Sequence, residues 1–165
     1  MPSGRTHAFI TTLTAAGLFG YAYSTGTPQP AAIALAGGCL AGLILTPDLD
    51  VNGGVRSHTI VKREAGRLLA AAWRAIWLPY SRLLPHRHWL SHAPLVSTFL
   101  RVGYLSLIAW LLLLVTGNPW PWDELPGWWR FALAGLVVSD CLHWAADSSL
   151  THSRKLRRKT RMLGL

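Results

Sequence analysis

The segment THAFITTLTAAGLFGYAYSTGTPQPAAIALAGGCLAGLILTP, from Thr6 to Pro47, contains no Asp, Glu, Lys or Arg. One Gly- and Pro-rich stretch, from Ser24 to Pro30, interrupts it, and residues of this kind end one helix and begin the next. The segment therefore predicts a hairpin of two apolar helices. Each arm has about 16 or 17 residues, slightly fewer than the ~20 that span a bilayer comfortably. The sequence leaves open whether the hairpin crosses a membrane or packs as a buried pair.

Two further apolar segments run from about Ala93 to Thr116 and from about Trp128 to Leu150. The first contains LSLIAWLLLLV, from Leu105 to Val115, which is the strongest transmembrane signal in the chain. The Pro- and Trp-rich stretch from Gly117 to Gly127 is typical of a turn at a lipid headgroup interface. We therefore expect an all-α fold, a four-helix membrane-embedded bundle made of two hairpins.

The basic residues gather on one side of this expected bundle. The segment from Lys62 to Tyr80 mixes Arg with Leu and Trp, which predicts an additional amphipathic helix lying in the membrane interface between the hairpins. Residues 153–165 are strongly basic, and we expect a cytoplasmic tail there after a single helical domain at residues 1–152. By the positive-inside rule, both chain termini and the amphipathic helix lie in the cytoplasm.

Composition excludes several classes of protein. The chain has 165 residues, of which 51% are hydrophobic and 14% charged, the opposite of the balance that keeps a chain disordered. Cys39 and Cys141 both lie in apolar surroundings, which excludes a disulfide framework and a CxxC zinc module. The net charge of +9 sits beside apolar spans instead of forming a free basic domain. We therefore expect membrane lipids with anionic headgroups as partners, and no nucleic acid.

His and Asp side chains from four separate segments are expected at the cytoplasmic end of the bundle. A buried Asp or His costs a few kcal/mol within a membrane unless it finds a partner, and a divalent cation is such a partner. Imidazole and carboxylate without thiolate suit Zn, Mn or Fe, and the donors outnumber the four positions of one tetrahedral site. We therefore expect one or two ions held by a subset of these candidates: His7, Asp48, Asp50, His86, His88, His92, Asp140, His143 and Asp147.

Simpler roles remain open for several of these residues. Asp48 and Asp50 follow a proline and could cap a turn. Asp140 could form a buried ion pair with Arg101 instead of binding metal. His143 and Asp147, four residues apart on one helical face, could hold helices together by hydrogen bonding.

Four motifs together resemble a known family: MPSGRTH at residues 1–7, TPDLD at 46–50, His86-Arg87 followed by Ser91-His92, and His143 followed by Asp147. They resemble membrane-associated proteins of unknown function with predicted metal binding, related to the YdjM-like inner-membrane proteins regarded as metal-dependent hydrolases. The resemblance implies distant kinship to zinc-dependent phospholipase C and P1-type nucleases. It implies these ligands: His7, Asp48, Asp50, His86, His92, His143 and Asp147.

These observations predict a metal-dependent hydrolase of the bacterial inner membrane. We expect a phosphoesterase that acts on a lipid or lipid-linked phosphate at the cytoplasmic interface, with Arg5 and Arg87 orienting the anionic group of the substrate. The alternative is a non-catalytic metal-binding membrane protein with a structural, assembly or sensor role. A transporter fits less well, because four spans leave little room for a gated path unless a homo-oligomer supplies it.

Overall fold

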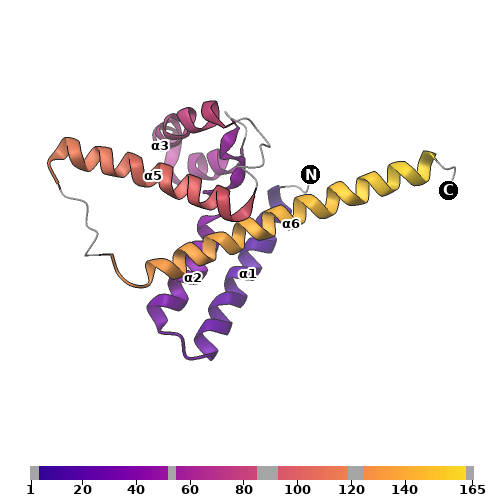
Figure 1. Cartoon of the computed structure of the whole chain (residues 1–165), viewed down its shortest axis with the longest axis horizontal. Helices are drawn as coiled ribbons and strands as arrows, with labels where there is room; N and C mark the ends of the chain where they lie inside the picture. The colour runs from indigo at the N-terminus through magenta and orange to yellow at the C-terminus, as the bar shows by residue number, and fades with distance from the viewer. Residues whose placement is uncertain (1–3, 52–54, 85–92, 119–124, 163–165) are drawn as a thin grey trace.

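The computed structural model describes residues 4–51, 55–84, 93–118 and 125–162. Over these ranges the chain is entirely helical, without a strand, which confirms the predicted all-α class for this part of the protein (Figure 1). The elements are α1 (Gly4–Ser24), α2 (Gln29–Ala41), the 3-10 helix η1 (Pro47–Asp50), α3 (Arg56–Leu83), α5 (Pro94–Thr116) and α6 (Trp129–Met162).

Helices α1 and α2 form the hairpin that the uncharged N-terminal segment predicts. The turn between them contains Gly26 with a φ of 80°, a left-handed conformation that favours glycine. Pro28 caps α2 and Pro30 lies in its first turn, where a missing N–H is tolerated. Helix α6 packs along this hairpin, most extensively against α2, so that three helices form the main packed unit (Figure 1).

Small residues let α2 and α6 approach closely. Gly38 and Gly42 lie four residues apart along this part of the chain, and a Cβ atom at Gly38 would overlap the backbone carbonyl of Ala132 on α6. From the other side, a Cβ atom at Gly135 would overlap the backbone of Leu35. The glycines of both helices therefore allow their backbones to touch, as small residues do where helices pack in membranes.

This contact gives a prediction about stability. Gly38→Ala should destabilise the protein by about 1–3 kcal/mol, because the new methyl group overlaps backbone that cannot rotate away. Gly37→Ala is the matched control, since a Cβ atom there meets nothing within 4 Å and alanine favours the helix. Denaturant unfolding of both variants in detergent measures the effect. Equal stability of the two variants would contradict the close contact.

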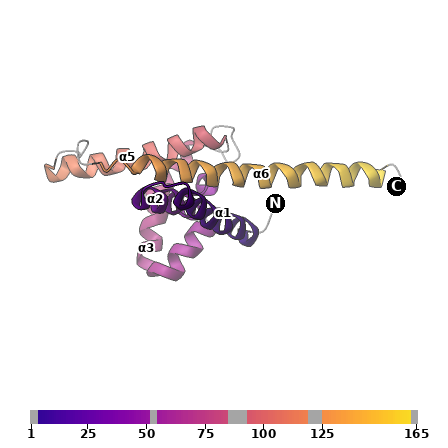
Figure 2. The ribbon, with the colours of Figure 1, turned by 90° about the horizontal axis from the view of Figure 1, so that it is seen from below.

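Helix α3 differs from the expected interfacial helix at Lys62–Tyr80. It begins earlier, at Arg56, and its course changes at Gly66, where the backbone is non-helical with a φ of 86° (Figure 2). Its second half packs Trp77 and Tyr80 against Leu49 of η1 in a buried cluster. This packing attaches α3 to the segment that carries Asp48 and Asp50.

Among the described helices, only α5 is long and apolar enough to cross a membrane, over Pro94–Val115. Only 11% of this span is buried inside the structure. Helix α2 is too short because it ends at Ala41, where the chain turns toward η1. The expected bundle of four spans is therefore not confirmed, and one candidate span stands in its place.

Helix α6 is longer than the predicted segment that ends near Leu150. It continues through the basic run to Met162, and its C-terminal part projects away from the rest of the described chain (Figure 2). No Gly or Pro follows Gly135 within this helix. Lys and Arg are good helix formers and interact favourably with a helix C-terminus, so the basic residues extend the helix instead of ending it.

Candidate metal centre

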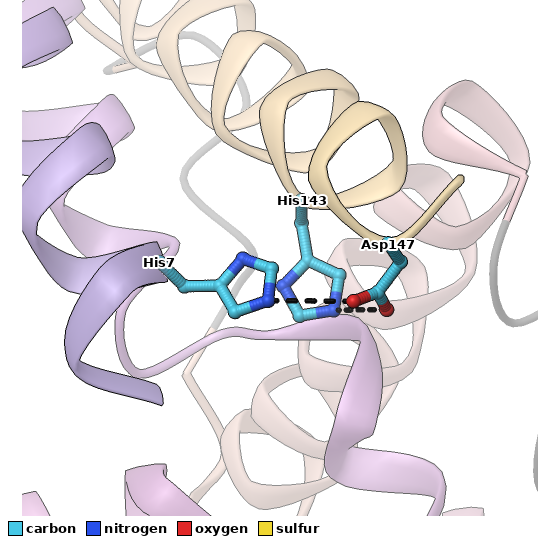
Figure 3. A group of neighbouring side chains, drawn as sticks. All are labelled: His7, His143 and Asp147. Carbon is cyan, nitrogen blue, oxygen red and sulfur yellow. Dashed lines mark ion pairs between the residues drawn. The ribbon is translucent and has the colours of Figure 1, made fainter. Parts of the chain in front are cut away.

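Three predicted ligands meet where the start of α1 lies against α6. His7 comes from the first turns of α1, while His143 and Asp147 are one turn apart on α6 (Figure 3). One donor atom from each of the three lies within 4.8 Å of the other two. Residues far apart in the sequence thereby bring their side chains into one small volume. These three residues are called the His–Asp group below.

The distances within this His–Asp group suit a small cation. Nε2 of His7 is 3.4 Å from Oδ1 of Asp147, and Nε2 of His143 is 3.5 Å from Oδ2 of the same carboxylate. Donors bound at about 2.0–2.2 Å from a tetrahedral ion stand about 3.3–3.6 Å apart. Each imidazole is therefore at a suitable distance from one oxygen of the carboxylate, and the three donor atoms together lie within 4.8 Å of one another.

Packing orients these donors. The rings of His7 and His143 stack, with centroids 4.3 Å apart and an angle of 18° between their planes. The side chains of His7, His143 and Asp147 are 17%, 13% and 22% exposed, and Nε2 of His143 and Oδ1 of Asp147 are themselves buried. The group is therefore sheltered from solvent.

Asp48 supplies a second carboxylate beside the group. Its Oδ2 atom lies 3.8 Å from Nε2 of His143. Thr46 caps η1 by accepting a hydrogen bond from the Asp48 backbone N–H, at 3.4 Å, and Pro47 begins the 3-10 helix. This local turn holds the carboxylate of Asp48 beside His143.

Asp50 lies in the same short helix but outside the His–Asp group of the described residues. It is buried, and its charge acts on the hydroxyl of Tyr80 in the neighbouring cluster. Burial raises the pKa of Tyr80 to about 12, so this phenol stays protonated at neutral pH. A ligand role for Asp50 stays a prediction.

Four of the predicted site residues have no described position. His86, Arg87, His88 and His92 lie outside the described residues, so their expected roles stay predictions. Arg5 is exposed at the start of α1 and is absent from the lining of the pocket next to the His–Asp group.

For Asp140, the structure shows the ion pair with Arg101 that the sequence left open. Both side chains are buried, and the guanidinium contacts Asp140 Oδ2. Arg101 also donates to the carbonyls of Leu45 and Ser97, while the hydroxyl of Thr98 donates to Asp140. The pair ties α5 and α6 to the turn that leads to Asp48. On α6, Asp140 lies one helical turn before His143.

A pocket adjoins the His–Asp group, and His7 and His143 are among its lining residues. Four of its polar residues were not predicted from the sequence: Thr11, Thr46, Arg56 and Ser139. No local pattern marks Thr11 or Ser139, which lie within apolar helices. Thr46 and Arg56, however, lie in and just after the TPDLD motif, which could have drawn attention to them.

Comparison with known proteins adds the family. A family model described as uncharacterized metal-binding protein (DUF2227) matches residues 2–157, nearly the whole chain. The chain belongs to this family. No curated protein and no solved structure matches it. The family description agrees with the metal binding expected from the sequence, and the two imidazoles and one carboxylate fit a metal ion by their chemistry and spacing.

Proposed function

We propose that this protein is a membrane-associated, metal-dependent phosphoesterase that acts on a lipid or lipid-linked phosphate. The observation that carries the proposal is the His–Asp group beside a pocket that several polar side chains help to line. A donor group that only staples helices needs no such pocket.

His7, His143 and Asp147 would hold the ion, which we propose to be Zn, Mn or Fe, since imidazole and carboxylate without thiolate suit these metals. Three protein ligands leave an open position, as in catalytic sites. A bound ion of this kind supplies a Lewis acid that polarises a phosphoryl oxygen and lowers the pKa of water. Asp50, His86 and His92 are the candidates for a second ion.

The side chains around the ion would have separate tasks. Asp147 contacts both imidazoles and orients them. Asp48, whose Oδ2 atom lies at the pocket, would accept the proton that an attacking water molecule loses. Stacking of His7 on His143 keeps both rings aligned during turnover.

Two surfaces support a membrane location. Helix α5 exposes large apolar side chains along its span, among them Leu107, Trp110 and Leu112. Helix α1 exposes Phe9 and Leu13, which lie two residues before and two residues after the buried pocket residue Thr11 in the sequence. We propose that α5 lies in the bacterial inner membrane and that α3 lies against anionic headgroups.

Hydrolysis of phosphatidic acid in detergent micelles tests the proposal. Phosphate release should require added Mn or Zn, stop with a chelator, and fall at least ~100-fold in Asp48→Asn, as expected for loss of a general base. Glu64→Gln is the matched control, because Glu64 is an exposed carboxylate paired only with its neighbour Arg63 in the described structure. Metal-dependent release that is equal in both variants would remove Asp48 from the mechanism.

A non-catalytic role is the second candidate, because the ligands come from different helices. An ion shared by His7 of α1 and Asp147 of α6 would staple these helices together. This role predicts that chelation lowers the melting temperature while no lipid phosphate is hydrolysed. Bound metal without phosphate release from any lipid or lipid-linked substrate would favour it over the phosphoesterase.

A further inference from the structure

The pocket beside the His–Asp group presents hydroxyl groups from three parts of the chain. Thr11 of α1, Thr46 before η1 and Ser139 of α6 all line it, and all three are buried. Hydroxyls donate and accept hydrogen bonds without adding charge. This wall therefore suits a small ligand with several oxygen atoms.

One arginine, Arg56, lines the same pocket. It is exposed, and no ion pair engages it in the described part of the chain, whereas Arg63 on the same helix pairs with Glu64. Arg56 is also the first residue of α3, whose N-terminus carries no side-chain cap. Arginine and uncapped backbone N–H groups both attract anions, and arginine in particular suits phosphate.

Asp140 also lines the pocket and has one acceptor atom that no described residue engages. Its Oδ2 atom receives Arg101 and Thr98, but its Oδ1 atom has no hydrogen-bond partner among the described residues. The side chain is 1% exposed, and Asp140 lines the pocket. Because Arg101 balances its charge, Asp140 can accept a hydrogen bond from a ligand hydroxyl beside an anion.

We propose that this pocket binds a phosphate monoester in its singly protonated form, with Arg56 recognising the anionic oxygens and Asp140 accepting a hydrogen bond from the one P–OH group. A phosphodiester has no such hydroxyl, so the pocket selects monoesters. The inference deepens the phosphoesterase proposal and rests on it, because it places the phosphate next to the ion held by His7, His143 and Asp147. It names Arg56, instead of Arg5 and Arg87, as the side chain that recognises the anion.

Calorimetric titration of the full-length, Zn-loaded protein in detergent with inorganic phosphate tests the recognition. Arg56→Gln should weaken phosphate binding at least ~10-fold, as loss of a charge-assisted hydrogen bond does, while the Zn content measured by elemental analysis stays unchanged. Arg63→Gln should bind phosphate like the parent, because Arg63 lies on the same helix but does not line the pocket. Dimethyl phosphate, a diester, should bind at least ~10-fold more weakly than inorganic phosphate, because it leaves the Asp140 acceptor unpaired.

The outcomes separate this inference from the function on which it rests. Normal Zn content with equal phosphate affinity in Arg56→Gln and the parent would overturn the inference and leave metal binding intact. Equal affinity for dimethyl phosphate would overturn the selection of monoesters. Absence of bound Zn from the parent protein would overturn the proposed function itself.

Competition distinguishes the two sources of the phosphate monoester, a lipid headgroup and a soluble compound. Phosphatidic acid in mixed micelles should displace inorganic phosphate if the monoester is a lipid headgroup, and glycerol 3-phosphate should displace it if the ligand is soluble. Displacement by either compound supports the monoester site and identifies its source. Failure of both to displace inorganic phosphate would overturn the proposal.

Discussion

Asp140→Asn is expected to destabilise the protein by about 3–5 kcal/mol, because it leaves the guanidinium of Arg101 buried without a counter-charge. Arg101 is fully buried, and its other hydrogen bonds go to neutral groups, the carbonyls of Leu45 and Ser97 among them. A neutral amide cannot balance the charge. Denaturant unfolding in detergent, followed by helical circular dichroism, measures the change.

Two further variants make this prediction specific. The exposed pair Arg63–Glu64 is the control, and Glu64→Gln should leave the unfolding midpoint unchanged within error, because exposed pairs contribute little. The double variant Arg101→Met with Asp140→Leu should recover much of the lost stability, since it removes both buried charges. If Asp140→Asn unfolds at the same midpoint as the parent, the pair does not contribute as the structure indicates.

The second large effect concerns the metal. His143→Ala removes an imidazole that lies close to the carboxylates of both Asp48 and Asp147. It should weaken binding of Zn or Mn more than ~100-fold, because changes in residues that only support a ligand already cost about 10–100-fold in affinity. A metal at about 100 times its Kd stabilises the folded protein by about 2.7 kcal/mol, and this metal-dependent gain should vanish in the variant.

His58→Gln is the matched control for this experiment. His58 lies on α3, outside the His–Asp group, and burial, followed by the charge of Arg74, lowers its pKa. Because His58 lies outside the His–Asp group, the variant should retain the metal content and the metal-dependent gain in melting temperature. Equal metal content in His143→Ala and His58→Gln would refute the proposed centre.

The sequence identified the helices well because the signals involved are local. Uncharged runs, Gly26 and the prolines at 28 and 30 act within a few residues, and they place the first hairpin correctly. The predicted helices differ from the observed ones at their ends and at the bend in α3. Helix α3 bends at Gly66 and starts before Lys62, and α6 continues through a basic run that was expected to follow it as a tail.

The candidate site divides in the same way. Residue type alone named His7, His143 and Asp147 as donors, and topology suggested that they meet at one end of the bundle. Whether Asp140 binds metal or pairs with Arg101 depended on which side chains face each other across α5 and α6. Arg56 follows the TPDLD motif closely in the sequence, but only the tertiary structure places it in the same pocket as Thr11 and Ser139.

By itself, then, the sequence determined an all-helical chain and named imidazole and carboxylate as the candidate metal-binding chemistry, but it predicted four membrane helices where the described structure has one candidate span. Only the tertiary structure shows that the backbones touch at Gly38 and Ala132 and that Arg101 pairs with Asp140. It also shows the pocket that Arg56 lines beside His143. Hydropathy and turn residues act over a few positions, whereas these contacts join residues distant in the chain and depend on how the helices pack together.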